Sequence, residues 1–432
     1  MKFVFQYKFI ILMLISVNNS IISQTIDSSQ NDSLALKISK ISNEINTLKK
    51  LKISGYLQTQ FQYCETAGAQ SFAGGDFISG TSKLNSRFMI RRGRIKFTYQ
   101  DENFLFSLQP DVNEKGITMR ETYVRVYDPW LKIASITAGL LQVPFGFELT
   151  QSSSVRETPE RARYNQILFP GERDLGVFLS ISVPESSMFN GLKLETSIMN
   201  GAASISPEFD NNKDFNERLS YHKSNKSKTF DLGIGISNYH GGYRIGNVKD
   251  YNFTSLPNGD KGYVVSSDTS NFNRKAVRNY HGADVQISVK IPRIGLATIR
   301  AEYIEGEQPG NNQNSKSLGF APTSPIFHRH FNGAYLYFIQ DIGQSPFQAV
   351  AKYDFYDPNT EITGNEIGKA GTLTNTGDIK YSTFGFGVNY SMNHHVKLSV
   401  YYDIVKNEST ALPGYQNDLA DNVTTVRLQY KF

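Results

Sequence analysis

The chain has 432 residues, 45 lysines and arginines against 40 aspartates and glutamates, and a single cysteine, Cys64. One cysteine excludes an intramolecular disulfide framework and a multi-cysteine metal site. The net charge of +5, without a basic run on a nucleic-acid fold, argues against DNA or RNA binding. The 24 tyrosines and 29 phenylalanines, with abundant glycine and asparagine for turns, favour strands over helices, so we expect an all-β fold.

Residues 1–23 have the pattern of a secretory signal peptide. Two lysines in MKFVFQYK precede the apolar stretch FIILMLISV, and a polar exit runs from Asn18 to Ser23. An apolar stretch of nine residues is too short to cross a bilayer, which takes about 20. We therefore expect an exported protein, with cleavage between Ser23 and Gln24.

Residues 24–52 combine a polar segment with a short heptad pattern. Five apolar residues are spaced 4, 3, 4 and 3 apart: Leu34, Ile38, Ile41, Ile45 and Leu48. This spacing predicts a helix that forms a short oligomeric coiled coil. The alternative is an amphipathic helix that packs on its own chain.

From Ile53 to Phe432 the apolar period changes to 2, which is the period of strands. Most of the sixteen expected strands have 10 to 14 residues. A tilted membrane strand takes about 9–11 residues, whereas soluble strands have about 5–6. The expected strands are 53–65, 84–99, 103–113, 117–127, 131–143, 172–183, 190–201, 228–239, 242–250, 275–290, 294–305, 327–340, 346–356, 378–391, 394–406 and 421–432.

Short and long connections alternate between these strands. Turns such as QDEN, YHGG and IPRIG alternate with long polar loops, and only Asn113–Gly116 is short where a long loop is expected. Short turns at one end, long loops at the other and an even strand number are typical of outer-membrane barrels. The long loops are 66–83, 144–171, 202–227, 251–274, 306–326, 357–377 and 407–420. We expect an antiparallel transmembrane β-barrel of 16 strands in the bacterial outer membrane.

Several segments resemble the phosphate-selective porin O and P family. They are ISGYLQTQFQY (53–63), RFMIRRGRIKFTY (87–99), MRETYVRVY (119–127), ITAGLLQVPFGFELTQSS (136–153) and FPGERDLGVFLS (169–180). The C-terminal Phe432, at the end of an alternating strand, also resembles the assembly signal of outer-membrane barrels. The resemblance implies a trimeric porin with an anion-favouring pore. It does not fix the solute.

Strand parity predicts which basic side chains line the pore. On the strand 84–99, Ile95, Phe97 and Tyr99 suit lipid, so Arg92, Arg94 and Lys96 are expected in the lumen. By the same rule Arg125 faces inward on the strand 117–127. The same parity places Arg87 and Arg91 on the lipid side near the extracellular rim, where a long side chain can reach water.

The loop 144–171 is the expected constriction, by analogy with porins; the alternative is a long surface loop. It carries Arg156, Arg161 and Arg163, and three glutamates balance them: Glu148, Glu157 and Glu160. Arg173, which follows the loop, is expected to pair with a carboxylate and pin the base of the loop or else to contact solute. Lumenal arginines would favour phosphate and other oxyanions. If they instead pair with glutamates across strands, the pore would be stiff and weakly selective.

The sequence thus predicts a homotrimeric porin for small hydrophilic solutes, anion-preferring, with outer-membrane lipid and copies of itself as partners. No nucleophile motif, phosphate-cradling loop or calcium-loop spacing occurs, so neither a cofactor nor a metal is expected. Two alternatives remain. One is a plugged structural or adhesive barrel that binds partners through its long loops, and the other is a barrel enzyme with a site at its rim.

Overall fold

The computed structural model describes residues 28–69, 76–204, 207–317 and 323–432, without the side chains of residues 28–34 and Asn43. The predicted signal peptide therefore lies outside the described residues. The chain divides into a unit that ends at Lys50 and a barrel unit, Leu51–Phe432. Among the described helices, none has the length and apolar character needed to span a bilayer.

The first unit contains one helix, α1 (Ser28–Lys49). The heptad positions Ile38, Ile41, Ile45 and Leu48 are all exposed on it. Side chains at this spacing form one apolar seam along the helix. The coiled coil and the alternative, in which the helix packs on its own chain, both stay predictions.

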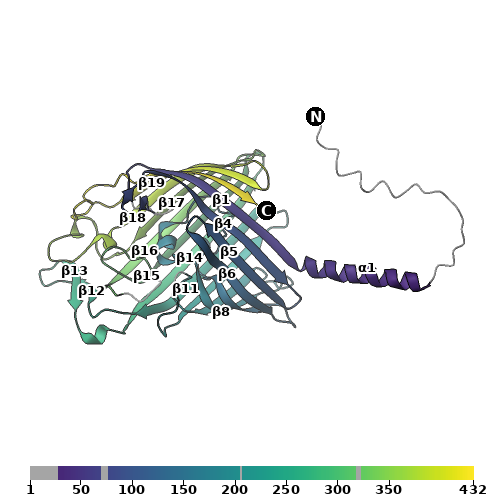
Figure 1. The fold of residues 1–432 in the computed structure, drawn as a ribbon. Coiled ribbons are helices and arrows are strands. Elements are labelled where there is room, and N and C mark those ends of the chain that lie inside the picture. Colours follow the sequence, from purple (N-terminus) through teal and green to yellow (C-terminus); the bar gives the residue numbers. More distant parts are fainter. Residues whose placement is uncertain (1–27, 70–75, 205–206, 318–322) are drawn as a thin grey trace. The chain divides into compact units, whose positions relative to one another are not determined.

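The barrel unit is a closed antiparallel barrel of 16 strands, as predicted (Figure 1). Its first strand, β1 (Leu51–Cys64), pairs on one side with β4 (Ser86–Gln100) and on the other with β20 (Val423–Lys431). The strands between them are β5 (Phe104–Asn113), β6 (Gly116–Tyr127), β7 (Ala134–Gln142), β8 (Arg173–Ser182), β9 (Leu192–Met199), β10 (Asp214–Ser224), β11 (Phe230–Arg244), β14 (Lys275–Ile291), β15 (Gly295–Gly310), β16 (Ile326–Asp341), β17 (Phe347–Asp357), β18 (Tyr381–Ser391) and β19 (Val396–Asn407).

The C-terminus takes part in the closure of the barrel. The backbone N–H of Phe432 donates to the carbonyl of Gly55 at 3.0 Å, and Gly55 N–H donates back at 3.1 Å. A side chain at Gly55 would collide with the Phe432 ring, because a Cβ there would lie 2.7 Å from it. Closure satisfies the backbone groups of both terminal strands, which a bilayer requires.

One predicted strand was wrong and one was missed, although the count of sixteen was correct. The strand expected at 242–250 does not exist as a barrel strand, and β10 lies inside the loop expected at 202–227. Gly241 and Gly242, interpreted as a turn, lie within β11. A Cβ at Gly241 would meet the Asp214 carboxylate at 2.2 Å, so the glycine makes room for a buried acid rather than for a turn.

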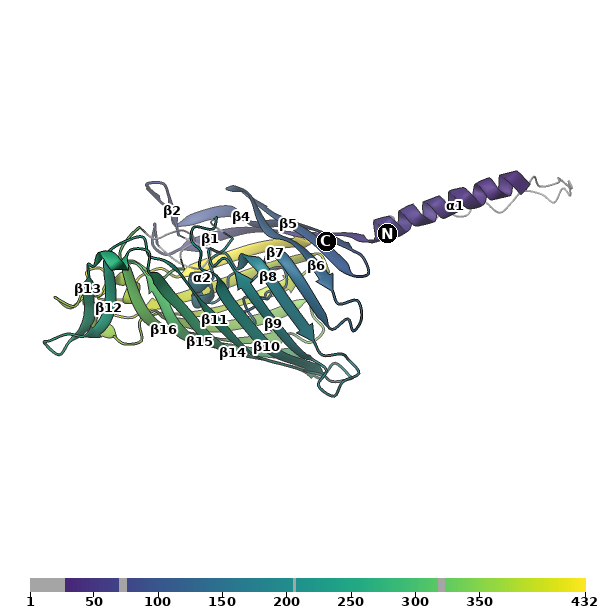
Figure 2. The ribbon, with the colours of Figure 1, turned by 90° about the horizontal axis from the view of Figure 1, so that it is seen from below.

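The long connections carry additional structure at one end of the barrel (Figure 2). They contain the hairpins β2 (Ile78–Ser79) with β3 (Ser82–Lys83) and β12 (Asp250–Ser255) with β13 (Lys261–Ser266). They also contain α2 (Arg163–Leu168) and three short 3₁₀ turns, η1 (Thr269–Asn271), η2 (Gly364–Glu366) and η3 (Thr376–Asp378).

A buried ion pair joins the loops at this end. Arg329 Nε donates to Asp378 Oδ1 at 2.8 Å, and both side chains are fully buried. The hydroxyl of Tyr263 on β13 and the amide of Asn359 donate to the same carboxylate oxygen at 2.6 and 3.0 Å. Two long connections and the barrel strand β16 therefore meet at one carboxylate.

Candidate functional site

A β-bulge in β4 places more arginines inside the barrel than parity predicts. Gln58 pairs with Arg92 and Thr59 pairs with Ile90, so Arg91 is the extra residue of the bulge. Arg91 turns inward and binds Glu160 in two contacts of 2.7 and 2.8 Å. The prediction of a lipid-side Arg91 was therefore wrong.

The same bulge reverses the parity of the residues that precede it. Arg87 binds the side chain of Gln62, which is completely buried, while Phe88 points outward against Phe61. The prediction of a lipid-side Arg87 was also wrong. All five basic residues of RFMIRRGRIKFTYQ thus lie on the inner face of β4.

A second bulge acts in the same way on β6. Gln109 pairs with Glu121 and Pro110 pairs with Met119, so Arg120 is the extra residue. Pro110 has no N–H to donate at this point of the ladder. Arg120 Nε donates to Asp111 at 3.2 Å on the inner face. Strict alternation of inward and outward side chains would have placed Arg120 on the lipid side, because its neighbour Glu121 faces inward.

The three basic residues predicted from the parity of β4 are each paired with a carboxylate. Arg92 lies 3.1 Å from Glu160, Arg94 lies 2.9 Å from Asp111, and Lys96 lies 2.7 Å from Glu121. Arg92 and Arg94 are buried, and Lys96 is partly exposed. These contacts favour the alternative in which wall charges pair across strands.

Arg125 differs from these three residues. Its Nε donates to the Thr137 hydroxyl at 2.9 Å, and its guanidinium lies over the Tyr123 ring at 5.4 Å. Within the described ranges no carboxylate forms an ion pair with it. Its positive charge is therefore not balanced by an adjacent side chain.

The loop between β7 and β8 lies inside the barrel, not on its surface. One side of the loop reaches β1, where Tyr56 and Gln58 bind Ser153 at 2.6 and 2.9 Å. The other side reaches β15 and β18, where Arg300 binds the Glu157 carboxylate at 2.7 Å and Asn389 donates to its carbonyl at 3.0 Å. The alternative of a surface loop was therefore wrong.

The PFGFE motif fixes the point where the loop leaves the wall. Glu302 of β15 accepts hydrogen bonds from the N–H groups of Phe147 and Glu148 at 2.9 and 3.2 Å. Gly146 has φ +57°, and a Cβ there would lie 2.1 Å from the Glu302 carboxylate. The motif thus needs glycine for its left-handed backbone and for the approach of the acid.

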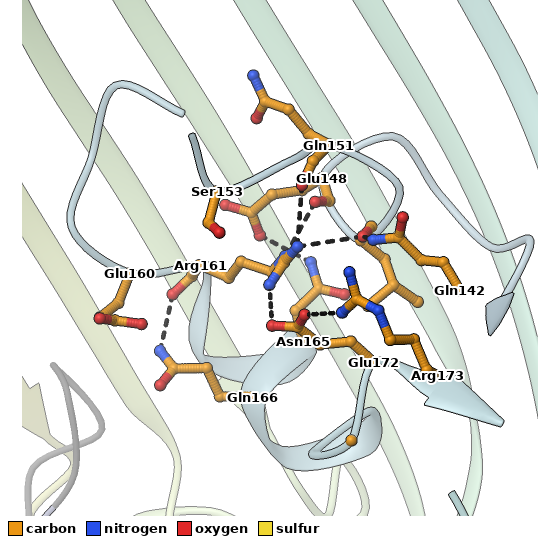
Figure 3. A network of polar contacts seen from close by, with 12 residues as sticks. Gln142, Glu148, Gln151, Ser153, Glu160, Arg161, Asn165, Gln166, Glu172 and Arg173 are labelled. Carbon is orange, nitrogen blue, oxygen red and sulfur yellow. Dashed lines mark hydrogen bonds and ion pairs between the residues drawn. The ribbon is translucent and has the colours of Figure 1, made fainter. Parts of the chain in front are cut away.

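The returning half of the loop is held by an ion-pair chain (Figure 3). Arg161 binds Glu172 and also the carbonyls of Glu148, Leu149 and Gln151. Glu172 in turn binds Arg173 at 2.6 Å, and Arg173 lies 3.4 Å from Glu121. The expectation that Arg173 pins the base of the loop is confirmed by these contacts.

Neighbouring charged groups determine the charge states of Glu172 and Arg161 in this series of ion pairs. Burial alone would raise the pKa of Glu172, but Arg161, Arg120 and Arg173 hold it well below the usual range. Burial lowers the pKa of Arg161 to about 10, although Glu172 opposes this shift. Both groups therefore stay charged at neutral pH.

An apolar core fastens the same loop to the opposite wall. Phe145, Leu168 and Phe169 of the loop are buried against the aromatic side chains of β11, β14 and β16. Phe169 lies 6.1 Å from Tyr239 and 5.8 Å from Tyr280, both edge to face. A core of this kind holds the loop as part of the wall.

Glu160 is the point where the loop meets the arginines of β4 and β20. It binds Arg91, Arg92 and Arg427, the last at 2.9 Å. Burial alone would raise the pKa of Glu160, but these three charges hold it well below the usual range. Glu160 is therefore a permanent negative charge among several positive ones.

Arg156 is the least satisfied of the predicted site residues. It is buried, and none of its three guanidinium nitrogens has a hydrogen-bond partner among the described residues. Arg92, Arg427 and Lys397 are close enough to interact with it electrostatically. Lys397 Nζ donates to the Arg156 carbonyl at 3.0 Å. This side of the loop therefore concentrates positive charge.

Arg163 occupies a different environment, on the side of the loop that faces β17 and β18. Its backbone N–H donates to Asp354 at 3.0 Å, and its guanidinium lies 4.2 Å from the centre of the Tyr381 ring. The seven predicted basic residues thus do not form one ladder. Arg92 and Arg156 are close enough to repel each other, whereas Arg125 and Arg163 lie elsewhere on the wall and loop.

A cavity of about 1130 Å³ lies over the loop at the long-loop end. Arg91, Arg120 and Arg161 line it together with Glu160 and Glu172. Tyr356, Tyr381, Tyr415 and Asp421 also line it. Arg163 lines it as well, so four arginines surround the cavity above the loop.

Sequence reasoning missed several of the charged residues inside the barrel. Arg120 and Arg91 were hidden by bulges, and Arg427 was not recognised as a partner of Glu160. In the described part of the chain, no three His, Cys, Asp or Glu side chains gather as metal ligands do.

Comparisons with known proteins show the fold alone. No family model matches the chain, so membership of the phosphate-selective family is not confirmed, and no curated protein matches it. The outer membrane channel DcaP of Acinetobacter baumannii is 12% identical, with a TM-score of 0.50 over 88% of this chain and 97% of that chain. An anion-selective porin from Comamonas acidovorans is 10% identical, with a TM-score of 0.50 over 88% and 99%. OmpT of Vibrio cholerae, in a trimer form, is 9% identical with the same score and the same coverage.

Proposed function

We propose that this protein is an outer-membrane porin through which small hydrophilic solutes diffuse, with a preference for anions such as phosphate and other oxyanions. The closed barrel, its membrane-length strands and the cavity of about 1130 Å³ support passage of solute. Two proteins with a similar fold, an outer membrane channel and an anion-selective porin, agree with the proposal.

The anion preference rests on one observation, the unpaired charge of Arg156. A buried charge without a partner is costly, so a site of this kind gains from a passing or resident anion. Glu160 offsets only part of the positive charge of Arg91, Arg92 and Arg427. Guanidinium groups suit oxyanions because they stay charged and offer forked donors.

The proposal includes the setting of the channel. Residues 1–23 direct export, residues 24–52 contribute a coiled coil, and residues 53–432 form a barrel that assembles as a homotrimer in the bacterial outer membrane. The resemblance of the PFGFE and PGERD segments supports a place in the phosphate-selective porin O and P family. Arg92, Arg94, Lys96, Arg125, Arg156, Arg161 and Arg163 are the residues proposed to face the anion path.

A second candidate is a plugged barrel that binds partners through its long loops. The apolar core between the inner loop and β11–β16 favours this reading, because it fills part of the lumen. The tight pairing of Arg94 with Asp111 also leaves that arginine little freedom to meet a solute.

Recording from single proteins in planar bilayers separates the two candidates. We expect steady conductance and, in a KCl gradient, a reversal potential on the anion side. A barrel without conductance would be plugged, and cation preference would overturn the anion claim. Addition of phosphate to one side then tests whether it lowers the chloride current, as a binding oxyanion should.

A further inference from the structure

Four consecutive short turns form one arc at the end of the barrel opposite the long loops. They join β6 to β7, β8 to β9, β10 to β11 and β14 to β15. Backbone hydrogen bonds connect neighbours along the arc: Ser182 to Ile133 at 2.8 Å, His222 to Gly191 at 3.0 Å, and Lys290 to Thr229 at 2.8 Å. Because short turns face the periplasm in barrels of this kind, the arc lies at the inner leaflet.

The first two turns expose large apolar side chains. Trp130 is 87% exposed, Leu131 71%, Met188 82% and Phe189 61%. These turns are ordered: Asp128 accepts hydrogen bonds from the N–H groups of Trp130 and Leu131 at 3.0 and 3.2 Å. The exposure is therefore built into the turn. Tryptophan and apolar neighbours at a barrel end suit the boundary between headgroups and acyl chains.

The next two turns expose basic side chains. Lys223, Lys226, Lys228, Lys290 and Arg293 are all exposed, and within the described part of the chain none of the five forms an ion pair. The acid of these turns, Asp231, binds His222 and Ser224 instead. By contrast, the turn between β4 and β5 carries Asp101 and Glu102. Positive charge thus gathers beside the apolar turns.

We propose that this arc binds the headgroup of an anionic phospholipid in the inner leaflet. The basic turns would hold the phosphate, and Trp130 with its apolar neighbours would lie against the upper acyl chains. Charge complementarity selects this occupant, since each basic residue near an anionic membrane surface adds roughly a fivefold gain in partition. The proposal rests on the membrane placement in the proposed function but not on conduction.

Trp130 reports on this site by itself, because the chain has one tryptophan. The full mature protein is placed in bilayers of phosphatidylcholine with an equal fraction of either brominated phosphatidylglycerol or brominated phosphatidylcholine. We expect the phosphatidylglycerol probe to quench Trp130 fluorescence several-fold more strongly. Equal quenching by the two lipids would overturn the proposal and leave an acidic protein as the partner of this surface.

A triple variant tests whether the basic turns cause the preference for phosphatidylglycerol. The variant combines Lys223→Gln, Lys226→Gln and Lys290→Gln, and it leaves Lys228 and Arg293 unchanged because both have positive φ. In this variant the two brominated lipids should quench Trp130 fluorescence equally. Lys249→Gln, Lys275→Gln and Lys406→Gln remove the same charge from exposed lysines near the long-loop end and should leave the preference intact. An unchanged preference in the first variant, or a lost one in the second, contradicts the assignment. Conductance plays no part in this readout, so a failed channel and a failed lipid site remain distinguishable.

Discussion

Glu160 and Arg427 lie 267 residues apart in the chain and 2.9 Å apart in space. Glu160 belongs to the inner loop, and Arg427 belongs to the strand that closes the barrel. Arg427 also donates to the Pro159 carbonyl at 2.7 Å, so the last strand holds the loop by side chain and backbone. The same carboxylate binds two arginines of β4. Loop position and lumenal charge are therefore set by one residue.

Glu160→Gln tests both roles. The substitution leaves three arginines without their shared counter-charge, and loss of one partner of a buried pair costs about 3–5 kcal/mol. We expect a lower temperature of barrel unfolding together with a stronger anion preference in reversal-potential measurements. Glu185→Gln removes the same charge from an exposed short turn and should change neither. An unaltered permeability ratio in Glu160→Gln would place Arg91, Arg92 and Arg427 away from the path of the ions.

Arg156→Met tests the unpaired guanidinium. Because Arg156 has no hydrogen-bond partner to lose among the described residues, an apolar side chain of similar length should leave stability unchanged or raise it. The anion preference should fall, since the positive charge is gone. Arg329→Met is the matched control: it removes the partner of fully buried Asp378 and should destabilise the barrel by about 3–5 kcal/mol. Equal destabilisation by the two substitutions would show that Arg156 has a partner.

Local pattern was enough to predict most of the barrel but little of the site. Strand alternation and loop lengths predicted the closed barrel, because the bilayer imposes period 2 on nearly every strand. β10 was not predicted because Glu217 stands at a position where alternation places an apolar side chain that faces lipid. Its carboxylate accepts a hydrogen bond from the Asn238 amide on the neighbouring strand. Bulges at Arg91 and Arg120 insert one residue without a clear sequence signal. The partners of Glu160 come from strands at both ends of the barrel sequence, which no local pattern connects.

Gly146→Ala tests the anchor of the inner loop. A methyl group there would meet the Glu302 carboxylate at 2.1 Å and would also sit at positive φ, so the hydrogen bonds from Phe147 and Glu148 should break. Gly371→Ala has a similar φ of +84° but open space around it, and isolates the backbone cost of about 1–2 kcal/mol. We expect Gly146→Ala to lose more thermal stability than Gly371→Ala. We expect noisier single-channel current only in Gly146→Ala. Equal behaviour of the two variants would contradict a role for the Glu302 contact.

Asp421 gives the anion preference a dependence on pH. Burial raises the pKa of this carboxyl, which lines the cavity, to about 6, whereas Glu160 and Glu172 stay ionised. As pH falls from 7 to 5, Asp421 takes up a proton, and the loss of one negative charge from the cavity wall should raise the anion-to-cation permeability ratio roughly twofold. Because the folded pKa lies above the unfolded value, the same group makes the fold less stable as pH rises from about 4 to 6. Asp421→Asn should remove both effects, and a pH response that survives in this variant would assign the titration to another group.

Ile41→Asn with Ile45→Asn tests the exposed seam of α1. Both side chains are exposed in the single chain, and a polar residue at two core positions of so short a coiled coil should cancel most of its apolar burial. We expect a loss of trimer, measured by light scattering in detergent, that matches removal of residues 25–52. Lys37→Gln with Lys40→Gln changes exposed positions outside the seam and should leave the trimer intact. A trimer that persists in the seam variant would mean that the barrel wall alone holds the three chains together.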